Sequence, residues 1–182
     1  MKLTVAMDTI IKELHDAKEY GSILTVTPQD WSALYDRFAE ITEDINMSRE
    51  TALRELLPLV QVAEALAQNY DAVVTNPPYM GASGKLSSFV KKKYPDTKSD
   101  MSTIMMERTL EMSTSHGYIS MINIPVWMFL SSYEKMRNTM LRNNMIVNMV
   151  HPGRGIFGSD FGTTTFVISK TYIKNYVGRY YR

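Results

Sequence analysis

The sequence lacks cysteine entirely, and its 182 residues include only three histidines, His15, His116 and His151. The absence of cysteine excludes disulfides, zinc fingers, iron–sulfur clusters and thiolate nucleophiles, and no two histidines are spaced as a ligand pair, so we expect no metal site. No apolar run approaches the roughly 20 residues that cross a bilayer, and residues 1–10 lack the apolar stretch of a secretory signal. We therefore expect a cytoplasmic protein with no membrane partner.

The chain has enough apolar residues for a core, and its charges are unevenly distributed. Hydrophobic residues make up 45% of the chain and charged residues 21%, as in a folded globular domain. Residues 1–70 hold six Lys/Arg against twelve Asp/Glu, whereas residues 71–182 hold fourteen against seven. The excess of positive charge in residues 71–182 is typical of solvated helix faces, and it equally suits binding to phosphate groups.

Residues 1–70 carry mainly helical patterns, and we predict a helical segment inserted before the strand that follows. We expect a helix over residues 1–20, a short strand over residues 22–26, a helix capped by Thr27, and a further helix from Ser48. None of these elements brings together residues with an evident chemical role.

Residues 71–171 alternate between strand and helix patterns, which predicts an α/β fold. Near-continuous apolar runs, typical of strands buried in a sheet, occur at residues 71–75, 118–124, 145–150 and 163–169. We expect helices at about residues 100–114 and from Ser131. Each would serve as a crossover connection between two strands, which makes the first three strands parallel. The short glycine-rich loop before the last strand favours an antiparallel return. We interpret residues 172–182, rich in Tyr and Arg, as the start of a connection to a missing domain.

The segment "TNPPYMG", from Thr75 to Gly81, stands where the first of these strands ends. Open α/β sheets place their ligand crevices at the carboxyl ends of parallel strands. Pro77 and Pro78 stiffen the chain, so that Asn76 Oδ1 and the Pro77 carbonyl can together accept both hydrogens of a planar amino group. The ring of Tyr79 offers a face on which a heterocycle can stack.

The "NPPY" sequence resembles the catalytic motif of amino-group methyltransferases that use S-adenosylmethionine, above all adenine-specific DNA methyltransferases. Four longer segments are similar to the large single-chain enzymes of type IIG restriction-modification and of BREX (phage growth limitation) systems: "DAKEYGSIL", "YDAVVTNPPYMG", "FVKKKYPDTKSD" and "HPGRGIFGSDFGTTTFV". The resemblance implies the carboxyl-terminal part of a Rossmann-like methyltransferase sheet. It also implies methyl transfer from S-adenosylmethionine to N6 of an adenine flipped out of double-stranded DNA.

The resemblance also implies roles for individual residues. Asn76, Pro77, Pro78 and Tyr79 would form the catalytic site, and Tyr79 would stack on the base. Phe157 occupies the position of a family aromatic residue that packs against the flipped base, with Phe161 in reserve. Candidates for contact with the DNA backbone are Lys85, Lys91, Lys92, Lys93 and Lys98, although a lysine run is also typical of a solvated helix face.

Family members bind S-adenosylmethionine through a glycine-rich loop and an acidic residue upstream of the motif, and residues 1–70 match neither. Gly21 is the only glycine before Gly81. We therefore expect a fragment that is catalytically silent alone and that works with DNA and the remaining domains of a parent polypeptide.

Two alternatives remain open from the sequence. Enzymes that methylate a glutamine amide of peptide release factors, and some ribosomal RNA enzymes, use the same motif on a similarly planar amine. A basic α/β piece can also bind nucleic acid or a partner protein without catalysing a reaction.

Overall fold

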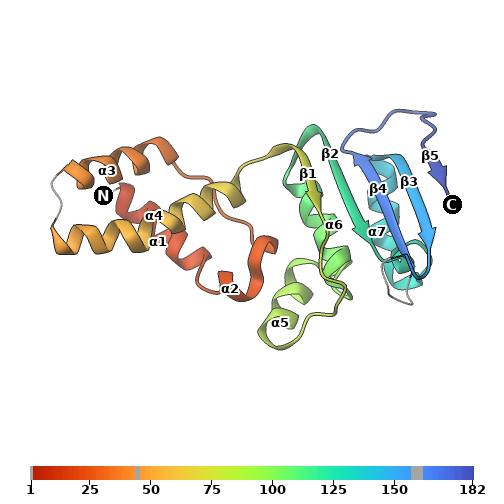
Figure 1. The fold of residues 1–182 in the computed structure, drawn as a ribbon, viewed down its shortest axis with the longest axis horizontal. Coiled ribbons are helices and arrows are strands. Elements are labelled where there is room, and N and C mark those ends of the chain that lie inside the picture. Colours follow the sequence, from red (N-terminus) through yellow and green to blue (C-terminus); the bar gives the residue numbers. More distant parts are fainter. Residues whose placement is uncertain (1, 44–45, 157–161) are drawn as a thin grey trace. The chain divides into compact units, whose positions relative to one another are not determined.

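The computed structural model describes residues 2–43, 46–156 and 162–182. The chain divides into two compact units, Met1–Gln68 and Asn69–Arg182 (Figure 1). Each unit is described separately below. The second unit holds the strands and the "NPPY" motif.

The first unit is helical. Its elements are α1 (Lys2–Glu13), α2 (Ala17–Tyr20), the 3₁₀ turn η1 (Gly21–Ile23), α3 (Trp31–Glu43) and α4 (Met47–Ala67). Both α1 and α3 contact α4, and their apolar faces meet at buried side chains such as Ile10, Phe38 and Val60. The Tyr35 hydroxyl donates a hydrogen bond of 2.6 Å to Glu64 across the α3–α4 contact. An apolar stripe on each helix thus forms the core.

Three local expectations for this unit are wrong. The first helix is interrupted at residues 14–16, and the expected strand at residues 22–26 is a 3₁₀ turn followed by chain without regular structure. Thr27 does not cap α3, because its amide and hydroxyl both donate to the Glu13 carboxylate, at 2.9 and 2.6 Å. Asp30 is the residue that accepts a bond from the first turn of α3, from the amide of Ala33 at 3.1 Å.

The second unit is built on a five-stranded sheet of order β1-β2-β4-β3-β5. The strands are β1 (Tyr70–Thr75), β2 (Ser113–Asn123), β3 (Met145–Gly153), β4 (Thr163–Ser169) and β5 (Arg179–Tyr181). β1 is parallel to β2, β3 is parallel to β5, and β4 runs antiparallel between β2 and β3. The expected α/β fold, with parallel strands and an antiparallel return over residues 163–169, is confirmed. β5 is an additional edge strand that the sequence did not predict.

Helices cover one face of this sheet. The helical elements are α5 (Gly84–Lys93), α6 (Met101–Glu111), the turns η2 (Pro125–Met128) and η3 (Ser131–Tyr133), and α7 (Glu134–Asn143). Figure 1 shows α6 and α7 on the same face, where Ile104 and Met140 belong to a core that includes Ile119, Phe166 and Ile168 of the strands. Alternation along each strand directs these apolar residues to the helix-covered face.

The opposite face of the sheet is exposed in part. Val74 of β1, Tyr118 of β2 and Val150 of β3 belong to this face and are 76%, 49% and 40% exposed. The sequence predicted a strand at residues 71–75 correctly, but its burial was predicted wrongly, because β1 lies at an edge of the described sheet. A parallel strand usually has cover on both faces.

The topology brings three strand ends to one edge. Because β1, β2 and β3 all run in the same direction, the segments after Thr75, Asn123 and Gly153 leave the sheet on the same side. The carboxyl edge of parallel strands is where α/β folds place ligands.

Candidate functional site

The "NPPY" motif begins where β1 ends, and residues 76–83 have no regular secondary structure. Asn76 and Pro78 are exposed, Pro77 is buried and Tyr79 is half-buried. The Tyr79 hydroxyl donates a hydrogen bond of 2.9 Å to Asn76 Oδ1. An amide oxygen has two lone pairs, so Asn76 Oδ1 retains capacity to accept from a second donor.

The start of α6 anchors the residues that follow the motif. The Met101 amide donates to the Met80 carbonyl at 2.8 Å. Asp100 caps α6, because its Oδ1 accepts from the amide and the hydroxyl of Ser102, at 2.8 and 2.5 Å. The motif is therefore held between a strand end and a capped helix start.

The environment of Tyr79 keeps its hydroxyl protonated. Burial of the ring, and secondarily the negative charge of Asp100, raise the pKa of Tyr79 above its ordinary value of 10.0. The phenol is therefore neutral at physiological pH and remains a hydrogen-bond donor to Asn76.

A cavity of about 560 Å³ lies at the carboxyl edge of the parallel strands. Four segments form its walls: the loop after β1, the segment after β2, the end of β3 and the start of β4. The lining residues are Tyr79, Ile124, Pro125, Val126, Phe129, His151, Arg154 and Gly162. The size falls within the roughly 300–1,000 Å³ of small-molecule sites, and a mostly apolar lining with a few polar groups is typical of them.

The structure places the predicted site residues in three groups. Tyr79 lines the cavity, and Asn76 is hydrogen-bonded to Tyr79 without being a lining residue itself. Phe157 and its reserve Phe161 lie outside the described residues. All five candidate lysines are exposed, and none lines the cavity: Lys85, Lys91, Lys92 and Lys93 on α5, and Lys98 before α6.

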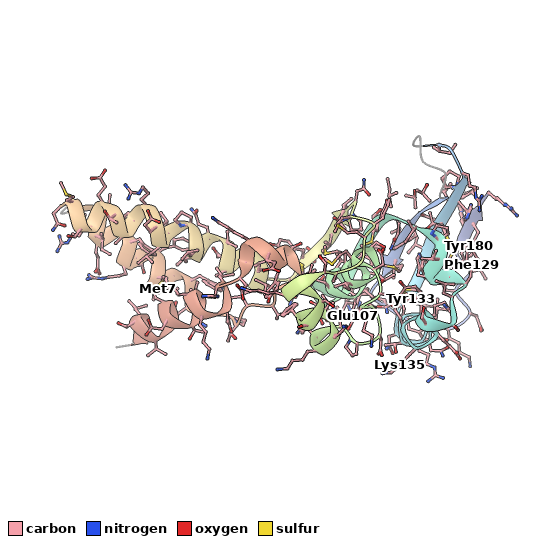
Figure 2. All side chains as sticks on the ribbon, turned by 90° about the horizontal axis from the view of Figure 1, so that it is seen from below. Met7, Glu107, Phe129, Tyr133, Lys135 and Tyr180 are labelled. Atoms are coloured by element: carbon pink, nitrogen blue, oxygen red, sulfur yellow. The ribbon has the colours of Figure 1, made fainter. Side chains whose placement is uncertain are left out.

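Apart from Tyr79, the lining residues were not predicted as site residues from the sequence, and Phe129, His151 and Arg154 are the aromatic or polar ones among them. Phe129, labelled in Figure 2, is 68% exposed. A signal for His151 was present, because the order His-Pro-Gly at the end of β3 parallels Asn-Pro-Pro at the end of β1. In both places a polar side chain precedes a proline where an apolar strand stops.

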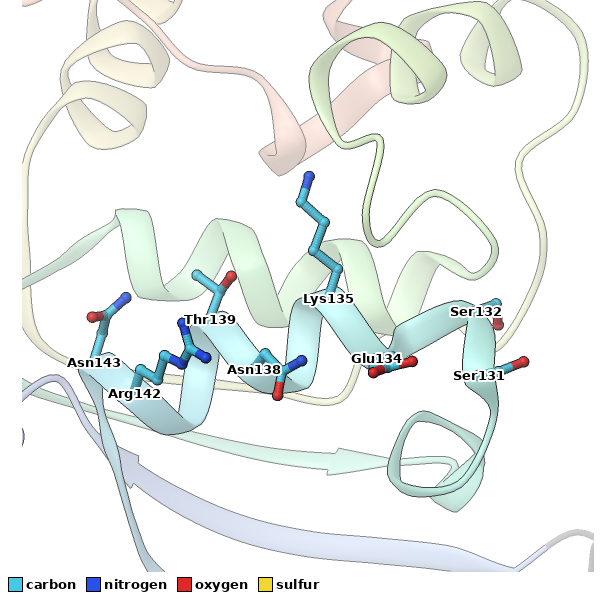
Figure 3. A pocket seen from close by; sticks show the side chains of 8 residues that line it. All are labelled: Ser131, Ser132, Glu134, Lys135, Asn138, Thr139, Arg142 and Asn143. Atoms are coloured by element: carbon cyan, nitrogen blue, oxygen red, sulfur yellow. The ribbon is translucent and has the colours of Figure 1, made fainter.

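A larger surface hollow of about 720 Å³ runs along α7 (Figure 3). Its lining is polar and exposed, and Lys135 within it forms an ion pair with Asp96 at 2.9 Å. The hollow contains no residue of the motif. The smaller apolar cavity is therefore the candidate site.

Two further findings concern the described part of the chain. It holds no cluster of three or more metal-ligating side chains. None of its helices combines the length and apolarity needed to cross a membrane.

Comparison with known proteins gives a consistent assignment. Residues 6–157 match the sequence profile of the Eco57I restriction-modification methylase family. The chain is 37% identical over 176 residues to the adenine-specific methyltransferase BrxX of Escherichia coli O9:H4 (strain HS), an alignment that covers 91% of this chain and 15% of that protein. It is 41% identical over 136 residues to the adenine-specific methyltransferase PglX of Lacticaseibacillus casei (strain Zhang), covering 70% of this chain and 11% of PglX. The chain thus spans less than one sixth of either relative.

Solved structures with the same fold include a methyltransferase. A protein from Listeria monocytogenes, described as a class I S-adenosylmethionine-dependent methyltransferase, superposes with a TM-score of 0.51 at 11% identity, covering 98% of this chain and 71% of that one. The resemblances stated from the sequence, to adenine-specific methyltransferases and to their Rossmann-like fold, are therefore confirmed.

Proposed function

This chain belongs to the Eco57I restriction-modification methylase family, and we propose that it forms the amine-binding part of an S-adenosylmethionine-dependent DNA adenine N6-methyltransferase. The observation that supports the proposal is the Asn-Pro-Pro-Tyr segment at the carboxyl edge of the parallel strands, with Tyr79 in the wall of a cavity of about 560 Å³. The names of the two relatives point to the same chemistry.

In this proposal Tyr79 receives the base. The target amine is out of reach inside a duplex, so the nucleotide must be flipped out, at a cost of roughly a few kcal/mol that stacking and hydrogen bonds offset. Tyr79 lines the cavity together with residues of the segments that follow β2 and β3. The mostly apolar lining suits the flat faces of a base.

Asn76 and Pro77 act on the amine. The nitrogen lone pair of adenine N6 is delocalised into the ring, and accepting both N–H groups at Asn76 Oδ1 and the Pro77 carbonyl localises that pair on nitrogen. The hydrogen bond from Tyr79 restricts rotation of the Asn76 amide. Catalysis then depends mainly on positioning.

S-adenosylmethionine supplies an electrophilic methyl group when bound. The described residues suit the amine rather than this cofactor, because the unit before β1 consists of helices and turns and offers no strand followed by a glycine-rich loop. We assign no cofactor-binding residue to this chain, and propose that other parts of a longer polypeptide supply them.

The proposed partners are double-stranded DNA and those other parts. The exposed lysines on and after α5 are proposed to contact DNA phosphates. The relatives support a role in restriction-modification or phage defence.

Replacement of Asn76 tests the proposal in the longest polypeptide that contains this chain. We expect Asn76→Ala to lower the rate of methyl transfer to adenine in duplex DNA by at least about 100-fold, with little change in DNA affinity. Asn138→Ala, at an exposed asparagine on α7, is the matched control and should transfer normally. The same assay with a peptide release factor as the methyl acceptor distinguishes methylation of a glutamine amide from methylation of DNA. Transfer to the release factor and not to DNA would contradict the proposal. A normal rate in Asn76→Ala would exclude the assigned role of Asn76, and DNA binding by the unsubstituted protein without methyl transfer would favour a non-catalytic binding role.

A further inference from the structure

Among the described residues, three buried side-chain polar atoms have no hydrogen-bond partner: Trp127 Nε1, His151 Nδ1 and Thr163 Oγ1. Native proteins satisfy most such atoms, so each exception needs an explanation. Other buried polar side chains of this unit follow the rule, since the hydroxyls of Thr109 and Ser113 each donate to a backbone carbonyl at 2.7 Å.

All three atoms belong to segments that form the candidate cavity. His151 is a lining residue. Trp127 lies in η2 between the lining residues Val126 and Phe129, and Thr163 directly follows Gly162, another lining residue. The three residues thus belong to segments that line the cavity of Tyr79, and His151 is the one among them that is itself a lining residue.

A break in the strand ladder determines where His151 lies. The pairing of β3 with β4 shifts between Val150 and Gly153, which leaves His151 and Pro152 outside the regular register. Irregularities of this kind often redirect a side chain beside a functional site. Gly153 follows with a φ of +89°, a conformation that suits glycine.

The imidazole of His151 is part of the cavity wall. A Cβ atom on Gly162 would lie 3.7 Å from His151 Cε1 and 3.7 Å from Pro125 Cγ, so these residues are in close proximity. No described group engages His151 Nδ1. Rotation of the ring by half a turn would exchange Nδ1 with a carbon position, so the bound ligand can determine which nitrogen faces it.

We propose that His151 is a specificity-determining residue that hydrogen-bonds a ring nitrogen of the purine held against Tyr79. The inference rests on the proposed function and extends it to the base itself. Asn76 and Pro77 are assigned to the exocyclic amine, which leaves the ring nitrogens of adenine as acceptors without a partner. An imidazole N–H is a suitable donor to such a nitrogen. His151 and Tyr79 approach the same cavity from the ends of β3 and β1.

Adenine analogues that each lack one ring nitrogen test this contact. The substrates are duplexes in which the target adenine is replaced by 1-deaza-, 3-deaza- or 7-deazaadenine, all of which keep the exocyclic amine. Values of kcat/KM are measured for the longest polypeptide containing this chain and for its His151→Phe and His151→Gln variants. His151→Phe keeps a flat ring and removes both nitrogens, whereas His151→Gln keeps an amide donor.

We expect the unsubstituted protein to lose on the order of 10-fold in kcat/KM on one analogue, the usual effect of a lost hydrogen bond in a desolvated site. On adenine, His151→Phe should show a similar decrease in kcat/KM relative to the unsubstituted protein. On that analogue, the kcat/KM of His151→Phe should be no lower than its value on adenine. His151→Gln should recover part of the kcat/KM on adenine. A His151→Phe variant that discriminates among the analogues as the unsubstituted protein does would overturn the proposal. If His151→Phe has no measurable activity on any substrate, the comparison is made with His151→Gln: a smaller penalty on the one analogue than in the unsubstituted protein supports the contact, and an unchanged penalty overturns it.

The two proposals fail in different ways. Absence of methyl transfer from the unsubstituted protein to any duplex contradicts the proposed function, and the role of His151 falls with it. Transfer that depends on Asn76, combined with a pattern of analogue preference that does not depend on His151, contradicts the role of His151 alone.

Discussion

At the scale of single residues, Tyr79 combines two features that separate variants can test. Its ring lines the cavity, and its hydroxyl holds the Asn76 amide through a bond of 2.9 Å. Under the proposed function the ring and the hydroxyl affect different steps, because stacking would concern capture of the base whereas orientation of the amide would concern the transfer itself.

Tyr79→Phe is expected to lower kcat roughly 5- to 10-fold, the equivalent of about 1 kcal/mol for one orienting hydrogen bond, and to leave KM for DNA nearly unchanged. Tyr79→Ala should raise KM as well, because it also removes the ring. Tyr118→Phe, at an exposed tyrosine of β2, is the control. Steady-state methylation kinetics check the prediction, and a Tyr79→Phe variant with unchanged kcat would argue against a role for the hydroxyl.

The sequence showed part of this site and missed part of it. The residue types and stiffness of Asn76–Tyr79 predict two acceptors and a ring at a strand end. The bond from Tyr79 to Asn76 depends on how the loop turns, and the position of His151 depends on a register shift between β3 and β4. The hydrogen bond and the register shift leave no local pattern in the sequence, although the His-Pro-Gly order gave a signal for His151 itself.

At the scale of elements, the start of α6 links helix capping to the chemistry of the motif. Asp100 accepts two bonds from Ser102, and its charge contributes to the raised pKa of Tyr79. The same carboxylate therefore stabilises the helix and influences a residue of the site.

Asp100→Ala and Asp100→Asn separate these two effects. Asp100→Ala should cost about 1 kcal/mol of unfolding free energy, whereas Asp100→Asn keeps a capping acceptor and should cost less. Both should lower the pKa of Tyr79, with burial maintaining part of the elevation. Urea unfolding at neutral pH measures the first effect, and tyrosinate absorbance relative to Tyr79→Phe measures the second. Equal costs for the two variants would contradict the assigned cap.

The sign of the pH effect follows from the direction of the shift. The pKa of Tyr79 is raised in the folded state above its ordinary 10.0, so its contribution to stability is complete below pH 10.0 and is lost as the pH rises through the folded value. Both Asp100 variants should therefore lose less stability over this alkaline range than the unsubstituted protein does.

Elements with strong periodicity were predicted better than their ends. The apolar runs of β1 to β4 are long enough to identify each strand. The cap of α3 was assigned to Thr27 rather than Asp30, because the sequence does not show that the carboxylate of Glu13 engages Thr27. A side chain of a type that often caps a helix can instead form hydrogen bonds with a residue distant in the sequence.

At the scale of the whole molecule, the proposed reaction assigns the amine-binding groups to the described residues and assigns none of them to the cofactor. We predict that the 182-residue chain alone binds S-adenosylmethionine weakly or not at all. Isothermal titration calorimetry checks this, with the longest polypeptide containing the chain as the positive control. Micromolar binding by the chain alone would show that its own residues hold the cofactor.

The strand order also has a consequence for synthesis on the ribosome. β4 lies between β2 and β3 in the sheet but is made after both. A nascent chain that ends before Thr163 has made β2 and β3 without the strand that joins them, so the middle of the sheet must stay open during vectorial synthesis. Closure of the sheet, and with it the approach of the ends of β1 and β3, therefore waits until β4 has been made.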